Sequence, residues 1–195
     1  MSEIDATIES DLRYITSNNF IGKPIDGYQK KKVIISTPAA EALKKVQSKL
    51  VSFGLSLKIF DAYRPQQAVD HFVRWAKLVN DTLMKKSYYP DVKKKDLFAL
   101  DYIAFKSGHT RGSTVDLTII DLSTKKELDM GSSYDFFGEA SHPFYKNLSK
   151  NQRSNRLLLR NLMLEAGFIP YAKEWWHFTL KEEPYPNTYF NFSIK

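Results

Sequence analysis

The sequence contains no cysteine. Disulfide bonds and thiolate metal ligands are therefore excluded, and any metal site must be built from nitrogen and oxygen donors. Histidine is scarce, with four residues in 195. Long apolar runs are also missing, since no stretch approaches the roughly 20 residues that cross a bilayer, so no membrane span is expected. These absences make the few histidines and their acidic neighbours the first residues to consider.

Positive charge exceeds negative charge, with 29 lysines and arginines, 22 aspartates and glutamates, and a net charge of +7. Such an excess can accompany nucleic-acid binding. However, the basic runs at positions 30–32 and 93–95 are not interleaved with aromatic residues, as a base-stacking surface would be. We interpret both runs as solvated and expect no nucleic-acid partner. The acidic, polar N-terminus lacks a signal pattern, which predicts a cytoplasmic location, or a periplasmic one if a signal was removed.

The length and the order of periodic segments predict one compact domain over residues 1–195. Helical spacing is expected from Thr37 (as N-cap) and Pro38 to Gly54, from Pro65 onward, and over 152–166. The first two helices are expected to bury Phe53 and Val79, respectively, among their apolar residues. The alternating segments 55–61 and 113–120 and the aromatic-rich segment 174–180 are expected to be strands, while 87–106 shows no regular period. The predicted class is α+β, with a mainly antiparallel sheet flanked by helices.

Three residues have the character of a catalytic zinc site. His109 and Asp116 occur in SGHTRGSTVD, and His177 occurs in EWWH. A catalytic zinc takes three such protein ligands and keeps an open position. Gly112 between the first two residues would let the chain turn and bring the histidine back over the acid. Taken singly, His109 also fits a turn cap and Asp116 a surface acid.

Glu174 and Arg64 are candidates for the chemistry around such a metal. Glu174 lies three residues before His177, so the two side chains share a face only if the chain turns at the two intervening tryptophans. A free carboxylate there can act as a general base. Arg64 follows the expected strand end in DAYRP, where a guanidinium can stabilise an oxyanion. By itself, Arg64 fits a surface ion pair better than a catalytic role, and the tryptophans fit core anchors.

The pattern SxHxxGxxxD followed by ExWH resembles the D-alanyl-D-alanine dipeptidases of the VanX type, within the zinc D-Ala-D-Ala peptidases. The resemblance extends nearly end to end. It is carried by residues 11–28, 61–65, 87–90, 107–118, 130–137, 174–178 and 183–192. One departure is Thr114, where the family pattern usually has alanine.

The resemblance implies a role for each candidate residue around one Zn²⁺ per chain in a central cleft. It implies metal binding by His109, Asp116 and His177, a general base in Glu174, and transition-state stabilisation by Arg64. It further implies a pocket in which Tyr14 and Asp135 hold the substrate ammonium, Ser107 and Tyr28 hold its carboxylate, and Asp61 orients Arg64.

The implied activity is hydrolysis of the small zwitterionic dipeptide D-alanyl-D-alanine to two D-alanines. The alternative is a D,D-carboxypeptidase or endopeptidase that cuts peptidoglycan stem peptides with the same metal site. Residues 83–106 and 130–143 are available as pocket walls, which favours the shorter substrate. A non-enzymatic zinc module would require the base or the arginine to be missing, and both are present. The physiological role stays open among antibiotic resistance, dipeptide recycling and cell-wall turnover.

Overall fold

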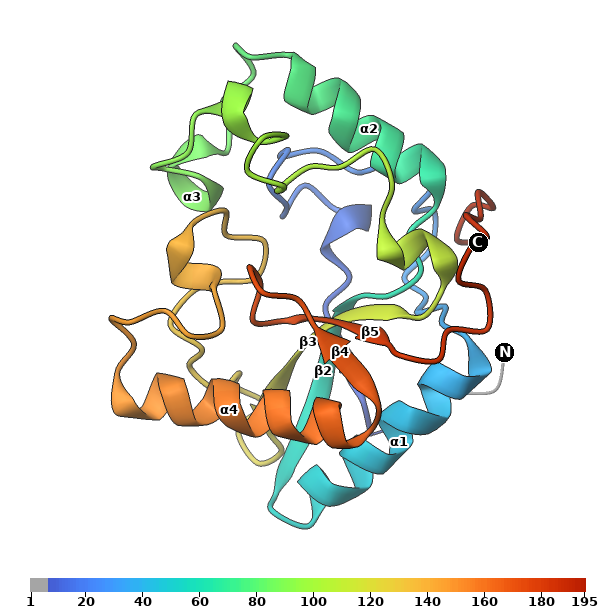
Figure 1. Cartoon of the computed structure of the whole chain (residues 1–195), viewed down its shortest axis with the longest axis vertical. Helices are drawn as coiled ribbons and strands as arrows, with labels where there is room; N and C mark the ends of the chain where they lie inside the picture. The colour runs from blue at the N-terminus through green and yellow to red at the C-terminus, as the bar shows by residue number, and fades with distance from the viewer. Residues whose placement is uncertain (1–6) are drawn as a thin grey trace.

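The computed structural model describes residues 7–195. Within these residues, a five-stranded sheet lies in the middle of the molecule (Figure 1). The strand order is β1-β2-β3-β5-β4. β1 is parallel to β2, whereas the other three neighbouring pairs are antiparallel, as the sequence predicts. The strands are β1 (Glu9–Ser10), β2 (Leu55–Asp61), β3 (Thr114–Asp121), β4 (Phe168–Pro170) and β5 (His177–Leu180).

Helices lie at both ends of the molecule, which confirms the predicted α+β class. α1 (Thr37–Val51) and α4 (Lys150–Glu165) lie at the lower end of Figure 1, and α2 (Gln66–Lys77) and α3 (Lys85–Tyr88) lie at the upper end. Short 3₁₀ turns are η1 (Arg13–Ile15), η2 (Lys94–Asp96), η3 (Gly108–Arg111) and η4 (Glu139–Ser141). Within residues 7–195, no helix combines the length and the apolar character needed to span a bilayer.

Two helices end earlier than their apolar spacing predicts. α1 ends at Val51, so Phe53 lies beyond it and is 79% exposed, not buried. α2 ends at Lys77, and Val79 is 52% exposed for the same reason. The N-cap of α1 is Ser36, one residue before the predicted Thr37. Each error is at a terminus, where the helical period continues briefly past the last backbone hydrogen bond.

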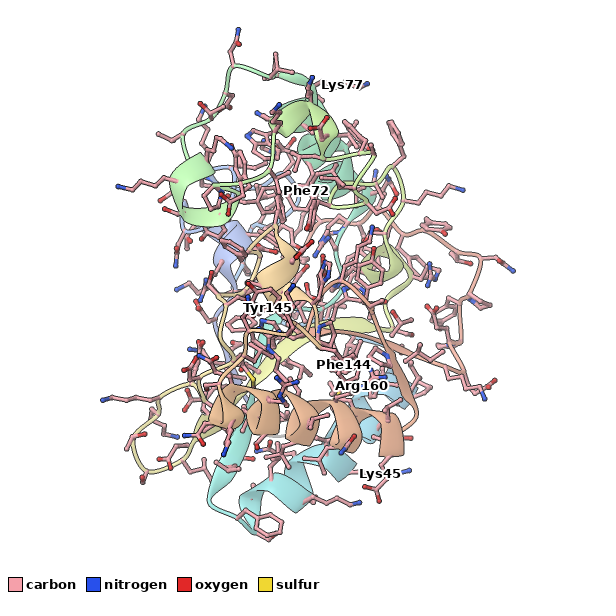
Figure 2. All side chains as sticks on the ribbon, turned by 60° about the vertical axis from the view of Figure 1, so that its left-hand side comes forward. Lys45, Phe72, Lys77, Phe144, Tyr145 and Arg160 are labelled. Atoms are coloured by element: carbon pink, nitrogen blue, oxygen red, sulfur yellow. The ribbon has the colours of Figure 1, made fainter. Side chains whose placement is uncertain are left out.

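α4 starts earlier than predicted because its N-terminus carries a capping box. The Ser149 hydroxyl accepts the Gln152 amide, and the Gln152 side chain accepts the Ser149 amide, so the helix begins at Lys150 rather than at 152. Further along α4, the Arg160 guanidinium lies 5.1 Å from the centre of the Phe144 ring, and Figure 2 shows the two side by side. This contact holds the preceding segment against the helix.

The register of the sheet brings three candidate residues into one row. Asp61 of β2 pairs with Asp116 of β3, and Asp116 pairs with His177 of β5. The first pairing depends on a bulge, because the register shifts by one residue between Ile59 and Asp61. Paired residues project to the same face of a sheet. The bulge therefore moves Asp61 to the face that carries Asp116.

β3 is buried on both faces. Every residue of β3 except Asp121 is buried, including the acid Asp116 and the hydroxyl residue Thr118.

One of the two basic runs, at positions 93–95, differs from its interpretation as solvated. Lys94 is 4% exposed, and its ammonium donates to the carbonyls of Leu78 and Asp81 while lying 4.0 Å from the centre of the Trp75 ring. Lys94 is therefore a structural contact of the α2 end.

A buried arginine of α4 anchors the loop at 130–142. Arg156 is 3% exposed. Its guanidinium donates to three backbone carbonyls at 2.6–2.7 Å, those of Met130, Ala140 and His142. These bonds fix a loop without regular secondary structure over most of its length, and this loop carries Asp135.

We expect Arg156→Ala to lower the free energy of unfolding by about 2–4 kcal/mol, because it leaves buried carbonyls without donors. Denaturant unfolding measures the change. Arg153→Ala is the matched control on the same helix, since Arg153 is exposed and makes a single 3.4 Å contact with the Lys146 carbonyl. Equal effects of the two substitutions would contradict an anchoring role for Arg156.

Candidate active site

His109 is placed by η3 and by the turn that follows it. Gly112 ends η3 with φ of +82°, a left-handed conformation that glycine adopts without strain, so the expected turn at this residue is confirmed. The Ser36 amide donates to the Gly112 carbonyl at 2.7 Å, which ties the turn to the start of α1. At the other end of η3, the Ser107 hydroxyl accepts the His109 amide. The loop histidine is thus fixed at both ends of its turn.

The His109 ring has one nitrogen committed and one free for a ligand. Its Nδ1 lies 2.6 Å from the Ala62 carbonyl, an acceptor that requires the proton to be on Nδ1. The lone pair is then on Nε2, which faces Asp116 at 3.2 Å. Burial lowers the pKa of His109 and so favours the neutral ring. A backbone carbonyl that orients a histidine is a usual outer contact of metal sites.

His109, Asp116 and His177 converge closely enough to hold one metal ion. Each offers one donor atom, and these atoms lie within 4.8 Å of one another. His177 Nδ1 is 3.0 Å from Asp116 Oδ1 and 3.3 Å from His109 Nε2. Although the first distance is short, Oδ1 has no hydrogen-bond partner among the described residues. A buried carboxylate that faces one imidazole nitrogen with each oxygen and has no hydrogen bond at Oδ1 fits a nitrogen-and-oxygen metal site.

The charge of Asp116 is stabilised by its neighbours. Burial opposes ionisation, but His109 and His177 outweigh it and hold the pKa of Asp116 well below its usual range. The pKa of His177 is raised despite burial, because the negative charges of Asp116 and Glu174 lie close to its ring. The central carboxylate is therefore an anion, the form that binds a metal.

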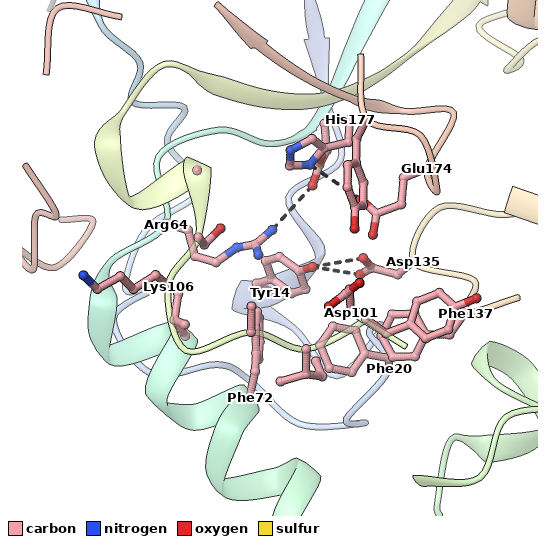
Figure 3. Close-up of a pocket in the computed structure, with 18 residues that line it drawn as sticks. Tyr14, Phe20, Arg64, Phe72, Asp101, Lys106, Asp135, Phe137, Glu174 and His177 are labelled. Carbon is pink, nitrogen blue, oxygen red and sulfur yellow. Dashed lines mark hydrogen bonds and ion pairs between the residues drawn. The ribbon is translucent and has the colours of Figure 1, made fainter. Parts of the chain in front are cut away.

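Glu174 lies beside the cluster without belonging to it. Its Oε2 is 3.6 Å from His177 Nδ1, and its side chain is 18% exposed. The chain turns at Trp175 and Trp176, so the turn expected there is confirmed; β5 begins only at His177, not at 174 as predicted. Burial raises the pKa of Glu174 to about 7. The carboxylate faces the cavity in Figure 3.

Arg64 is held by a short chain of hydrogen bonds from behind. The Tyr28 hydroxyl donates to Asp61 Oδ1 at 2.8 Å, and Arg64 Nε donates to Asp61 Oδ2 at 2.9 Å. Arg64 Nη2 then reaches Asp116 Oδ2 at 3.4 Å. Arg64 lines the cavity, whereas Tyr28 and Asp61 do not. The Tyr28 hydroxyl, expected at a substrate carboxylate, is instead bonded to Asp61.

Tyr14 and Asp135 lie together at another part of the wall. The Tyr14 hydroxyl donates to Asp135 at 2.9 Å and 3.1 Å from its two oxygens, and both residues are buried. Asp135 has φ of +62°, which is uncommon for a residue with a side chain and often marks functional sites. Burial and the nearby Asp116 raise the pKa of Asp135 well above its usual value. A cation beside this carboxylate would stabilise its charged form.

These groups surround a cavity of about 270 Å³ (Figure 3). That volume is just below the range of about 300–1,000 Å³ that pockets for drug-sized ligands occupy. Figure 3 shows Arg64 on one side, Asp135 and Glu174 on the opposite side, and His177 above. Apolar residues complete the wall, among them Phe20, Val69, Phe72, Ile103 and Phe137.

Both segments expected as walls contribute to the cavity. Residues 101–104 and 106–108 line it, as do Asp135 and Phe137. Lys173 ties the first segment to the turn before Glu174, since its ammonium lies 2.9 Å from both Asp101 and the Leu100 carbonyl. The Lys106 ammonium points away from His177 in Figure 3 and lies 4.9 Å from the centre of the Tyr189 ring. The aliphatic part of the Lys106 side chain therefore lines the wall, and its ammonium group does not.

Sequence reasoning missed Tyr134, whose hydroxyl lies 3.2 Å from Asp116 Oδ2 and 3.1 Å from the Tyr14 hydroxyl. It also missed the Ala62 carbonyl, because backbone acceptors leave no residue signal. The signal for Tyr134 was its position directly before Asp135 in MGSSYDFF. Seven of the ten predicted site residues line the cavity. Of the other three, His109 contacts His177 within the cluster, and Tyr28 and Asp61 contact each other next to Arg64.

Three side chains that could hold a metal ion, with a further carboxylate beside them, resemble the arrangement with which metal-dependent hydrolases activate water. The comparisons place the chain in this class. A family model of the M15 peptidases, a metallopeptidase family, matches residues 1–195 and is described as D-ala-D-ala dipeptidase, so the chain belongs to that family.

Relatives with curated names agree over nearly the whole chain. A D-alanyl-D-alanine dipeptidase of Enterococcus faecalis is 44% identical over 184 residues, which cover 94% of this chain and 91% of the relative. Proteins with the same name from Enterococcus faecium and Streptomyces coelicolor are each 40% identical, and each alignment covers 100% of this chain and 96% of the relative.

Thr114, which departs from the family pattern, has a hydroxyl with a partner in the structure. The Thr114 hydroxyl lies 2.9 Å from that of Thr179, linking β3 to β5 beside the cluster. It also crowds Gly108, because a Cβ built on Gly108 would lie 2.7 Å from Thr114 Oγ1. Gly108 begins the turn that carries His109. The hydroxyl at position 114 therefore requires a residue without a side chain at position 108.

We expect Gly108→Ala to lower the free energy of unfolding by about 1–3 kcal/mol through overpacking. Adding Thr114→Ala should recover most of this loss, since it removes the atom in the way. Denaturant unfolding of the two single variants and the double variant measures the coupling. An equal cost of Gly108→Ala with threonine or alanine at position 114 would refute the contact as its cause.

Proposed function

We propose that this chain is a zinc dipeptidase, folded as one domain over residues 1–195, that hydrolyses D-alanyl-D-alanine to two D-alanines. The names of the relatives and the family support the reaction. The observation that carries the proposal is the cavity itself. A small cavity with a cation on one side, an anion on the other and the cluster of His109, Asp116 and His177 between them suits a short zwitterion.

The pocket roles follow from this polarity. Asp135, oriented by the Tyr14 hydroxyl, would pair with the substrate ammonium. Ser107, which lines the cavity next to His109, would bond the substrate carboxylate. Tyr28 and Asp61 would serve through Arg64, since the hydrogen bonds from Tyr28 to Asp61 and from Arg64 to Asp61 fix the guanidinium. This differs from the direct carboxylate contact that the resemblance implied for Tyr28.

His109, Asp116 and His177 would hold one zinc ion per chain, since two imidazoles and a carboxylate suit a catalytic zinc. When bound, zinc supplies a Lewis acid that polarises the scissile carbonyl and acidifies water. The carboxylate of Glu174 accepts the proton as water attacks the carbonyl carbon, and later returns it to the leaving amine. The Arg64 guanidinium stabilises the negative charge that develops on the carbonyl oxygen.

The second candidate is a D,D-carboxypeptidase or endopeptidase acting on peptidoglycan stems. A stem peptide would have to extend past Asp135, a buried residue of the loop that Arg156 anchors. The dipeptide reading is therefore favoured. We further propose a cytoplasmic location, with the free dipeptide as the substrate for resistance, recycling or wall turnover.

The dipeptide assignment predicts strong rejection of blocked substrates. N-acetyl-D-Ala-D-Ala presents a neutral amide to Asp135, so its kcat/KM should be about 10⁴-fold below that of the free dipeptide. Asp135→Asn should reduce that ratio mainly by slowing the free dipeptide. Steady-state assays of both substrates and of a pentapeptide stem give the comparison. Comparable kcat/KM values for the pentapeptide stem and the free dipeptide would instead support the carboxypeptidase.

The metal and base assignments predict different losses. Removal of zinc by a chelator, or His177→Ala, should abolish both metal content and activity. Glu174→Gln should retain zinc while kcat falls by about 10²–10⁴-fold, the usual contribution of general acid–base catalysis. Elemental analysis and kcat should be measured on the same preparations. Loss of zinc from Glu174→Gln would make Glu174 a ligand, and an unchanged kcat would remove it as the base.

A further inference from the structure

Tyr134 is a buried residue at the centre of the site to which the mechanism above gives no task. It is 2% exposed and comes from the loop that Arg156 anchors. Its hydroxyl contacts two groups with separate roles, Asp116 Oδ2 at 3.2 Å and the Tyr14 hydroxyl at 3.1 Å. Tyr134 therefore lies between the metal cluster and the proposed ammonium site.

The ring of Tyr134 has little freedom to move. It is stacked on Phe60 of β2, with ring centres 4.5 Å apart and an angle of 10° between the planes. The Trp176 ring packs edge-on against it, with centres 5.5 Å apart. Phe60 is the extra residue at the bulge of β2, so the bulge that places Asp61 also supports this ring. The hydroxyl consequently has a fixed position relative to β3.

The two oxygens of Asp116 have different surroundings. Oδ2 is approached by Tyr134 at 3.2 Å, by His109 Nε2 at 3.2 Å and by Arg64 Nη2 at 3.4 Å. Oδ1 has no hydrogen bond from the described residues. If His109 is a metal ligand, its nitrogen cannot donate to Oδ2. The donors left to Oδ2 are then Tyr134 and Arg64, of which Tyr134 is the nearer.

We propose that Tyr134 is a positioning residue for the metal site. Its hydroxyl donates to Asp116 Oδ2, fixes the rotation of the carboxylate and leaves Oδ1 directed at the metal. This inference rests on the proposed zinc site and adds a residue that acts through Asp116 without touching the metal. The Tyr134 hydroxyl also lies 3.1 Å from the Tyr14 hydroxyl, so it stands between the carboxylate of Asp116 and the pair of Tyr14 and Asp135.

The test compares Tyr134→Phe with Tyr63→Phe, each of which removes one buried hydroxyl and keeps the ring. Tyr63 is 2% exposed and donates to the Phe192 carbonyl at 2.9 Å, away from the cluster. Zinc affinity of the full chain is measured by competition with a chromophoric chelator. We expect Tyr134→Phe to weaken zinc binding by about 10–100-fold, the usual effect of removing an outer contact of a ligand, and Tyr63→Phe to leave it within about 2-fold.

A second measurement separates carboxylate orientation from general loosening. The cobalt-substituted Tyr134→Phe variant should show a changed visible absorption spectrum at full occupancy, because a rotated carboxylate alters the coordination of the ion. Equal zinc affinities in both variants, or an unchanged cobalt spectrum, would overturn the proposal for Tyr134. A wild-type chain that binds no zinc would overturn the proposed function as well, so the two failures are distinct.

Discussion

The burial of the Asp116 carboxylate in the central strand is the constraint on which the site depends. An ionised carboxylate costs several kcal/mol to remove from water unless cations and donors surround it. Arg64, two imidazoles and a phenol supply that surrounding here. Asp61 and Asp135 are buried nearby, so acid exceeds permanent positive charge in this region. A divalent cation bound there would balance this excess of negative charge. Binding of the cation would therefore stabilise this region of the fold.

The fold meets this constraint with contacts from segments far apart in the chain. The register supplies Asp61 and His177, the turn ended by Gly112 supplies His109, and a loop held by Arg156 supplies Tyr134. None of these segments would hold its position without a neighbour from another. Rigid placement of donors before substrate arrives is the main source of electrostatic catalysis. The contacts that stabilise the buried charge of Asp116 thus also hold the donors of the site in place before substrate binds.

Much of this was predictable from the sequence, for identifiable reasons. The ligands stand next to glycine and tryptophan in short motifs, so their residue types and spacing indicated the cluster that the geometry then assembled. Helix ends were less predictable, as Phe53 shows, because apolar spacing does not record where hydrogen bonding stops. The positions of Tyr28, Tyr134 and Lys94 depend on long-range packing, which leaves no local pattern. The sequence therefore predicted which residues converge better than it predicted the contacts that support them.

The bulge in β2 has a consequence for how the chain tolerates insertions and deletions. Up to Ile59, alternate residues of β2 face the same way as their partners Leu117 and Ile119, and the register shift then brings Asp61 opposite Asp116. Removal of Phe60 would give a regular ladder that keeps Asp61 opposite Asp116, but it would also remove the ring on which Tyr134 stacks. The extra residue at the bulge thus matters for the ring that supports the site, because the strand pairing alone would survive its loss.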